Sequence, residues 1–403
     1  MKRALCLFFL VGFFVLHTSQ TWAAEKTPIK HLCQAVLSGK LGSVSETAWG
    51  YIDAAAYTNE RGGVNGRKYE IILEDYSYEQ DKSLTIYNRV VNAQPKNELF
   101  FNSAWGTGTL LANAERVKED KIICIDGAMS TQIFDENVRK NYPYYFSVGV
   151  TYGDQFGLIY KFLKETLHKG KQGKPKVAFI YMDHAAGIDP INKMKMYADR
   201  FGIDLVLIEP ISFTATDYTT TMMKIRESGA DYVACNIWGV PTQTRWLKAV
   251  KNYLPNKTIL AQSYFALEIY FDTAGDAFDN VYMVSLYPTR NETDNPLVKT
   301  WNDIIKKKER KVLSTEHYIH GWLMVRLGAE AARRADVAGK LTRDGVRDAL
   351  ENMKDWTVDG LYNGKALDYS MHCFSDARIL RSDFKTKSLI PVTDWLKVSD
   401  YLK

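Results

Sequence analysis

The chain has 403 residues, of which 46% are hydrophobic, and it carries 52 lysines and arginines against 47 aspartates and glutamates. Its basic residues occur only in short runs such as Lys306-Lys307-Lys308. No basic stripe suits a phosphate backbone, so a nucleic-acid partner is not expected. The sequence has no GxGxxG loop after its first strand and no Walker A, GxSxG or HExxH motif. We therefore expect neither an enzyme nor a bound cofactor.

The first 23 residues have the pattern of a secretory signal peptide. Lys2 and Arg3 precede an apolar run from Ala4 to Leu16, and Thr21-Trp22-Ala23 places small residues at the signal-peptidase positions. A run of this length is too short to span a membrane, which takes about 20 residues. Cys6 precedes the apolar run, so no lipid anchor is expected. The pattern predicts export and cleavage after Ala23.

From Ile29 onward, apolar runs typical of buried parallel strands alternate with segments whose apolar residues recur every three or four positions. In Thr47–Asn59, for example, the repeat is carried by Ala48, Ile52, Ala55 and Ala56. The expected strands of this first unit are Ile29–Leu37, Tyr69–Glu74, Leu99–Ala104, Ile122–Ile125 and Tyr144–Val148, with helices at Thr47–Asn59 and Thr109–Lys118.

The same alternation of strands and helices then begins again, which predicts two similar α/β lobes rather than one large sheet. The expected strands of the second unit are Val177–Met182, Leu205–Ile211, Tyr232–Trp238, Thr258–Gln262 and Val281–Ser285, with helices at Ile191–Phe201, Tyr218–Ser228 and Thr242–Tyr253. After Pro288 we expect helices at Pro296–Lys308, Glu316–Arg334 and Thr342–Met353, then strands at Ala366–Tyr369, Cys373–Leu380 and Leu389–Trp395.

Three loops follow strands of the first unit, where open parallel sheets bind ligands. They are Leu37-Ser38-Gly39, Ser103 to Gly108 and Asp126 to Ser130. Their glycines let a backbone approach a ligand, and their hydroxyls and helix N-terminal amides suit an anionic group. The alternative is ordinary turn and N-cap chemistry.

Two other sets of residues are interpreted as structural. The spacing of His317 and His320 places both on one face of a helix, and we interpret them as a pair on the helix surface. No further ligands complete a metal site. The four cysteines after the signal region, Cys33, Cys124, Cys235 and Cys373, are far apart in sequence. We interpret them as core thiols, although an exported protein permits disulfides.

An ordered set of short motifs resembles the leucine/isoleucine/valine-binding family of periplasmic solute-binding proteins. The motif from Gly62 to Glu70 ends a helix with Gly62-Gly63 and enters a strand through Asn65-Gly66. The other motifs of the set are Thr216-Asp217-Tyr218, Ser228-Gly229-Ala230-Asp231-Tyr232-Val233 and Asp344-Gly345-Val346-Arg347-Asp348-Ala349-Leu350. Each motif is weak alone, but the resemblance as a whole spans residues 29 to 395.

The resemblance implies the type I periplasmic binding protein fold, with two Rossmann-like α/β lobes joined by a three-strand hinge. The implied lobes are 24–149 with 286–357, and 150–285 with 358–403. It also implies a periplasmic monomer that closes on a small-molecule ligand and delivers it to an inner-membrane ABC permease and its ATPase. The alternative is a sensor on the same fold that signals through a receptor.

The family pattern places the ligand between the lobes and departs from expectation at two positions here. Thr107, Ala128 and Ser130 match residues that hold a ligand carboxylate. Ser263 stands where amino-acid-binding members have the acid that holds the ammonium, and Val44 replaces a tyrosine. Asp183 or Glu268 are candidate replacements for that acid. Aromatic residues that could enclose an apolar body are Trp105, Trp238 and Tyr264. The ligand is thus expected to be a hydrophobic amino acid or a related small carboxylate, amide or aromatic acid.

Overall fold

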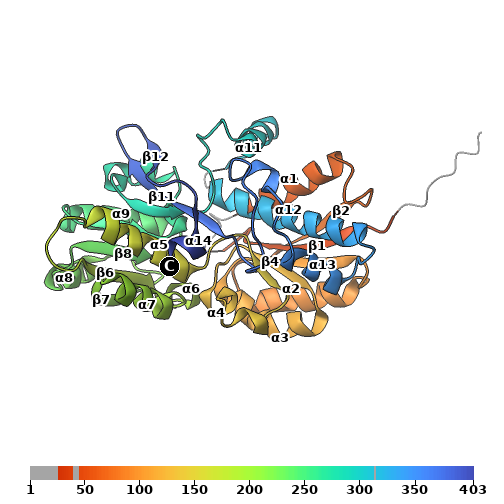
Figure 1. Cartoon of the computed structure of the whole chain (residues 1–403), viewed down its shortest axis with the longest axis horizontal. Helices are drawn as coiled ribbons and strands as arrows, with labels where there is room; N and C mark the ends of the chain where they lie inside the picture. Colours follow the sequence, from red (N-terminus) through yellow and green to blue (C-terminus); the bar gives the residue numbers. More distant parts are fainter. Residues whose placement is uncertain (1–25, 40–44, 313–314) are drawn as a thin grey trace, which may run out of the picture.

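The computed structural model describes residues 26–39, 45–312 and 315–403. Two α/β lobes lie side by side along the longest axis of the molecule, each with a sheet inside and helices outside (Figure 1). The predicted signal peptide, its cleavage after Ala23 and the departure at Val44 lie outside the described residues. In the part of the chain that is described, no helix combines the length and apolar character needed to cross a membrane.

The first lobe contains a five-stranded parallel sheet in the order β2-β1-β3-β4-β5. Its strands are apolar runs buried beneath helices, and Ile29 of β1 lies opposite Tyr69 of β2. The strands are β1 (Ile29–Ala35), β2 (Tyr69–Asp75), β3 (Leu99–Ser103), β4 (Ile123–Asp126) and β5 (Tyr145–Ser147). Between them lie α1 (Glu46–Glu60), α2 (Gln80–Ala93), α3 (Thr107–Asp120), α4 (Thr131–Phe134) and the 3-10 turn η2 (Arg139–Asn141).

The second lobe contains an eight-stranded mixed sheet in the order β12-β11-β10-β9-β8-β6-β7, with β13 paired to β11. Strands β6 to β10 are parallel, and β11 joins β10 in the antiparallel sense. The strands are β6 (Lys176–Met182), β7 (Asp204–Ile211), β8 (Tyr232–Asn236), β9 (Thr258–Ala261), β10 (Tyr282–Ser285), β11 (Asp376–Asp383), β12 (Ser388–Pro391) and β13 (Leu396–Lys397). The helices are α5 (Tyr152–Phe162), η3 (Leu163–Leu167), α6 (Ala185–Ile188), α7 (Ile191–Phe201), α8 (Thr219–Glu227), α9 (Val240–Tyr253), η4 (Ser263–Phe265), α10 (Tyr270–Thr273), η5 (Gly275–Phe278) and α14 (Val398–Tyr401).

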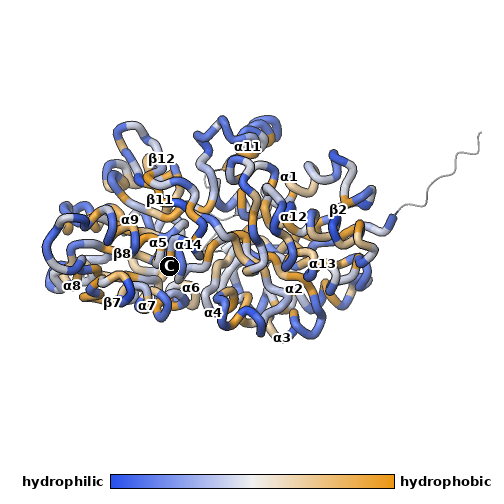
Figure 2. The backbone as a smooth tube through the Cα atoms, in the orientation of Figure 1, coloured by the Kyte–Doolittle hydropathy of each residue, from blue (hydrophilic) through white to orange (hydrophobic). Residues whose placement is uncertain are grey.

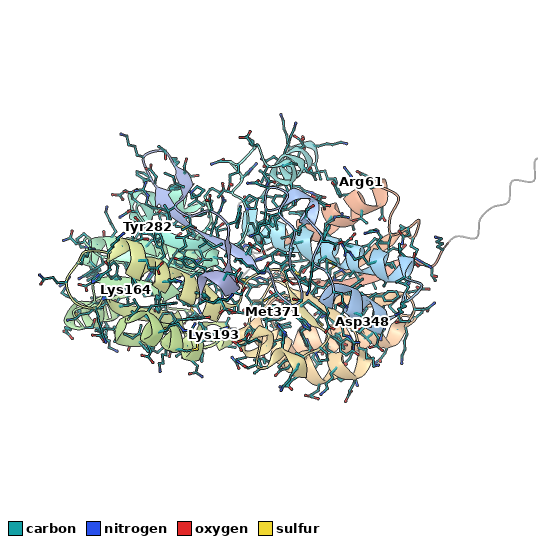
Figure 3. The ribbon with its side chains drawn as sticks, in the orientation of Figure 1. Arg61, Lys164, Lys193, Tyr282, Asp348 and Met371 are labelled. Carbon is teal, nitrogen blue, oxygen red and sulfur yellow. The ribbon has the colours of Figure 1, made fainter. Side chains whose placement is uncertain are left out.

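The chain passes between the lobes three times: after β5, after β10 and before β11. After β10 it returns to the first lobe, where α12 packs against α1 and β4, and α13 packs against α12 and β4. The elements of this return are α11 (Pro296–Lys307), α12 (Thr315–Val337), α13 (Arg343–Glu351) and η6 (Val358–Gly360). Lys193 and Met371 lie where the two lobes meet (Figure 3). The residue boundaries proposed for the lobes stay a prediction.

Helices α1 and α12 cross at very short range through a pair of glycines. A Cβ on Gly50 would lie 2.1 Å from the Tyr318 carbonyl oxygen, and one on Gly321 would lie 2.1 Å from the Thr47 carbonyl oxygen. No larger residue fits either position without moving backbone, because real Cβ contacts are longer than 3 Å. This crossing fixes the first turns of α12, which carry Glu316, against the first lobe.

Hydrophobic stretches lie inside each lobe and hydrophilic ones on the outer loops (Figure 2). The two predicted series of parallel strands are confirmed, as are the predicted helices. The four described cysteines are buried free thiols, which confirms the interpretation as core residues. The prediction of a strand at Ala366–Tyr369 was wrong: Leu367 makes only an isolated bridge to Trp356, because a single pair does not extend into a ladder. Helix α5 was not predicted at all.

Candidate functional site

The loops that follow the strands of the two lobes meet along the boundary between the lobes. From the first lobe come the β3–α3 and β4–α4 connections, and from the second the β6–α6, β8–α9 and β9–η4 connections. The ring of Trp105 lies 5.5 Å from the ring of Tyr264, centroid to centroid. The rings of Tyr78 and His184 stack at 5.8 Å. The lobes are therefore closed upon one another.

A small cavity of about 10 Å³, roughly the space of one water molecule, lies at this boundary, and its wall is mostly aromatic. The three aromatic residues predicted from the sequence, Trp105, Trp238 and Tyr264, all contribute to it. The remaining lining residues are Tyr78, Gly106, Tyr152 and Ala186. The Tyr152 and Tyr264 hydroxyls are 3.0 Å apart, which fixes the orientation of both rings within the second lobe. Tyr78 and Tyr152 were missed, although each is adjacent to an expected strand end.

Buried polar atoms without hydrogen-bond partners gather near this cavity. They include both indole nitrogens, Trp105 Nε1 and Trp238 Nε1, and the hydroxyls of Thr107 and Ser263. Leaving such a group unsatisfied costs about 1–3 kcal/mol. Thr107 is the first residue of α3, where backbone N–H groups also lack partners within the helix. Several unsatisfied donors around one cavity suit a bound molecule that supplies acceptors.

Ser130 and Ala128 are buried as expected, but their polar groups are already engaged. The Ser130 hydroxyl donates to Asp189 Oδ1 at 2.6 Å, across the boundary between the lobes. The Ala128 amide donates to Asp126 Oδ1 at 2.7 Å. Burial raises the pKa of Asp189, and the hydrogen bonds from Ser130, Thr131 and Gln132 oppose that rise. A ligand anion could accept the Ser130 hydroxyl hydrogen bond only by displacing the Asp189 carboxylate.

The prediction that His317 and His320 form an exposed pair on a helix surface was wrong. His317 is only 5% exposed and His320 is 0% exposed, because the start of α12 is covered by the second lobe and by aromatic rings. The ring centroid of Trp105 lies 5.4 Å from that of His317, and the ring centroid of Tyr287 lies 5.4 Å from that of His320. Burial lowers the pKa of His317 to about 3, and burial together with the neighbouring His317 lowers the pKa of His320 well below its usual range. Both rings are thus neutral at physiological pH.

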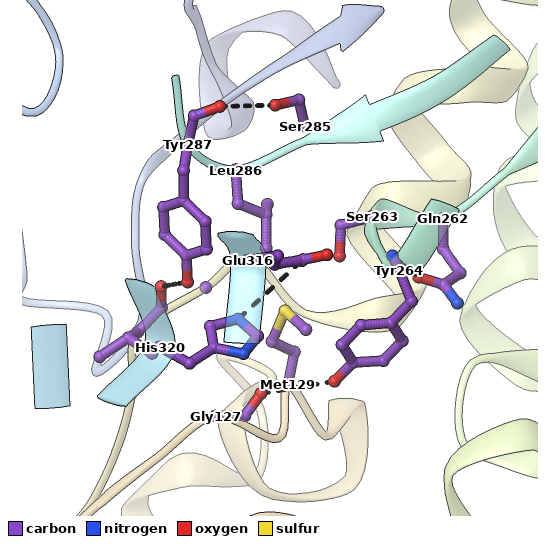
Figure 4. Close-up of polar contacts among 12 residues, drawn as sticks. Gly127, Met129, Gln262, Ser263, Tyr264, Ser285, Leu286, Tyr287, Glu316 and His320 are labelled. Atoms are coloured by element: carbon purple, nitrogen blue, oxygen red, sulfur yellow. Dashed lines mark hydrogen bonds and ion pairs between the residues drawn. The ribbon is translucent and has the colours of Figure 1, made fainter. Parts of the chain in front are cut away.

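Glu316, on the same turn of α12, was not proposed as a ligand-binding residue. Its carboxylate is buried beside Ser263, and neither of its oxygens makes a hydrogen bond (Figure 4). His320 Nε2 lies 3.9 Å from Glu316 Oε1. Burial raises the pKa of Glu316; the Ser263 hydroxyl opposes that rise and the charge on Glu268 adds to it. Among residues 26–39, 45–312 and 315–403, no cluster of three or more such side chains is placed to hold a metal ion.

The sequence profile of the periplasmic binding protein family matches residues 35–379. The chain belongs to the periplasmic binding protein family. A comparison with curated protein sequences gives no significant match. The matched range includes every site residue discussed above, from Trp105 of the first lobe to Glu316 on α12.

Solved structures of similar shape support the type I periplasmic binding protein fold. A branched-chain amino acid ABC transporter protein from Thermus thermophilus, with bound valine, has a TM-score of 0.81 at 20% identity, covering 93% of this chain and 98% of that one. A fatty acid ABC transporter substrate-binding protein from Thermomonospora curvata has a TM-score of 0.78 at 19% identity, covering 93% and 94%. A solute-binding protein from Rhodopseudomonas palustris, in complex with p-hydroxybenzoic acid, has a TM-score of 0.77 at 18% identity, covering 92% and 97%.

The family pattern gives the position of Ser263 a particular meaning in this periplasmic binding protein. The acid expected at that position is absent, and the carboxylate of Glu316 lies directly beside the Ser263 hydroxyl instead. Of the two replacements suggested by sequence, Asp183 is exposed, whereas Glu268 lines a separate cavity together with Glu316.

Proposed function

We propose that this chain is the extracytoplasmic solute-binding component of an ABC importer. It captures a small solute with an apolar body between its lobes and delivers that solute to an inner-membrane permease and its ATPase. The observation that carries the proposal is the small cavity with an aromatic wall that lies between the lobes. The bound molecules named for the similar structures, valine and p-hydroxybenzoic acid, are small acids with an apolar body and support this class.

In this proposal each predicted site residue has a role. Trp105, Trp238 and Tyr264 enclose the apolar body, since they form the wall of the cavity. Thr107, at the start of α3, receives a polar or anionic end of the solute. Ala128, Ser130 and Ser263 complete the surroundings of that end. The solute class is a hydrophobic amino acid or a related small carboxylate, amide or aromatic acid.

The proposal also covers where and how the protein works. The chain is exported, cleaved after Ala23 and active in the periplasm as a monomer. Three passages between the lobes make a hinge motion the natural way to admit and release solute. No chemical conversion of the solute is part of the proposal.

A thermal-shift screen tests this function. The panel contains leucine, valine, phenylalanine, p-hydroxybenzoate, octanoate and their amides. A true ligand at 100 times its dissociation constant adds about 2.7 kcal/mol to the free energy of unfolding, which raises the melting temperature measurably. The shift should vanish in Trp105→Ala and persist in Trp49→Ala, because Trp49 lies on α1 and is 37% exposed. A panel without any shift, or a shift unchanged in Trp105→Ala, would contradict the proposal.

A further inference from the structure

A second small cavity, of about 20 Å³, lies where the chain passes between the lobes after β10. One wall is the first turn of α12, which belongs to the first lobe. The opposite wall comes from the second lobe and from the passage itself. Its lining residues are Ala266, Glu268, Ser285, Leu286, Tyr287, Pro288, Thr289, Thr315, Glu316 and Ile319.

Glu316 is the most unusual of these residues, because it is a buried carboxylate beside a serine hydroxyl and neutral rings, with no cation next to it. It is 5% exposed, and both of its oxygens lack hydrogen bonds. Within the described ranges, its one ion-pair neighbour is His320, whose Nε2 lies 3.9 Å from Oε1, and that ring is neutral. Burying such a group without a partner costs several kcal/mol. A carboxylate at this place would therefore be stabilised by a bound molecule that supplies a partner for it.

The surroundings favour a positively charged partner over a neutral one. Glu268 lines the same cavity, so two carboxylates face one small space. The other titratable groups around Glu316 are tyrosines and histidines, which are neutral at physiological pH: Tyr264, Tyr270, Tyr287, His317 and His320. Arg290 is a cation near Glu268: its backbone amide donates to Glu268 Oε1 at 3.3 Å, and its charge favours the ionised form of Glu268 by lowering the pKa of that acid. The cavity thus has a net negative charge facing inward whenever either acid is ionised.

This acidic cavity and the aromatic cavity are neighbours. Ser263 lies beside Glu316, and the next residue, Tyr264, forms part of the aromatic wall. A solute of a few heavy atoms can therefore place an apolar body against Tyr264 and a charged group against Glu316.

We propose that Glu316 binds a cationic nitrogen of the solute, an ammonium or amidinium group, with Glu268 supporting it electrostatically. The acid that recognises the cation then comes from α12 of the first lobe and not from position 263 of the second. This inference rests on the proposed solute-binding function. It also supplies a replacement for the ammonium-binding acid that the family pattern expects at the position of Ser263.

Two trios of matched probes test the inference by isothermal titration calorimetry. Isopentylamine, leucine and 4-methylpentanoate share one apolar body and differ in charge, and benzamidine, benzamide and benzoate form a planar aromatic trio. At least one probe with a cationic nitrogen should bind more tightly than the probes of its trio that lack one. Its affinity should fall at least about tenfold in Glu316→Gln, a loss typical of a charged hydrogen bond. Burial raises the pKa of Glu316, and a cation beside it should lower that pKa, so binding should favour proton release, seen as a dependence of the heat on the ionisation enthalpy of the buffer.

The controls separate binding from folding and from the broader function. Glu309→Gln makes the same change at an exposed position and should leave all affinities unchanged. Glu316→Gln should melt at or above the wild-type temperature, since it removes a buried acid without a partner. If neutral or anionic probes bind best, or if Glu316→Gln changes nothing, the inference is overturned while the solute-binding function stands. If neither trio nor any member of the wider panel binds, both fail.

Discussion

The Ser130 hydroxyl of the first lobe donates a hydrogen bond of 2.6 Å to Oδ1 of Asp189 in the second lobe. The backbone amide of Thr131 donates to the other oxygen of Asp189 at 2.6 Å, and that of Gln132 donates to Oδ1 at 3.2 Å. We call these four residues the inter-lobe clasp. A carboxylate of the protein thus takes one donor, the Ser130 hydroxyl, that the family pattern assigns to a ligand carboxylate.

Removing the clasp should open the ligand-free protein. Asp189→Ala deletes every hydrogen bond that the clasp makes, so the radius of gyration measured by X-ray scattering should exceed that of the wild type. Asp183→Ala changes an exposed acid nearby in the sequence, in the β6–α6 connection, and should leave the radius unchanged. An unchanged radius in Asp189→Ala would show that other contacts, such as the 2.6 Å ion pair of Lys193 with Asp135, hold the lobes together.

Replacing Thr107 with valine should weaken solute binding without weakening the fold. The hydroxyl is fully buried and has no partner, so valine of similar shape removes an unsatisfied group. We expect an unchanged or higher melting temperature and about a tenfold loss of affinity for the best acid of the panel. Thr342→Val is the matched control, because the Thr342 hydroxyl accepts from the Gly345 amide at 3.0 Å and caps α13. It should lower stability by about 1 kcal/mol and leave affinity intact. The reverse pattern would contradict the role given to Thr107.

The stability of the protein should fall as the pH drops below 6.5, partly because of His31. This ring is fully buried between Tyr69 and Ser103, and burial lowers its pKa from 6.5 to about 3. Between pH 6.5 and pH 3 the His31 ring is therefore protonated in the unfolded chain but not in the folded chain. Its contribution to the free energy of unfolding is fully present above pH 6.5 and is lost progressively toward pH 3. Between pH 7 and pH 5 this one group should cost about 2 kcal/mol. Denaturant titrations of His31→Asn should show a pH dependence shallower than that of the wild type by this amount; equal slopes would contradict it.

The thiols should be unreactive in the folded protein. Burial raises the pKa of Cys33, Cys124, Cys235 and Cys373, which disfavours the reactive thiolate. Ellman's reagent should label none of these four before denaturation and all of them afterwards, without added reductant. Fewer labelled thiols after denaturation would reveal a disulfide.

Much of the fold could be predicted because the strands are buried on both faces and appear as apolar runs. For example, the sequence predicts Val177–Met182 where β6 runs from Lys176 to Met182. Helix α5 escaped prediction for the same reason: it is buried on nearly all sides, from Gln155 through Phe162, so it has no polar face to create a helical period.

The site could be predicted only in part, because its decisive residues depend on long-range packing. Trp105 and Tyr264 follow strands of their own lobes, and the position of strand ends is a local property. The role of Glu316 depends on the crossing of α12 with α1 at Gly50 and Gly321, which brings its first turn to the boundary between the lobes. Spacing alone shows that His317 and His320 share a face of α12, but not what covers that face.

A crystal structure of the protein with the tightest-binding member of the probe panel tests the central claim most directly. We predict that the solute lies between the lobes, with its apolar body against Trp105 and Tyr264 and its polar end within hydrogen-bond distance of Thr107. If it carries a cationic nitrogen, that nitrogen should contact Glu316. A solute bound elsewhere, for instance in the cavity of about 500 Å³ that includes Lys193, Arg200 and Lys397, would contradict the claim.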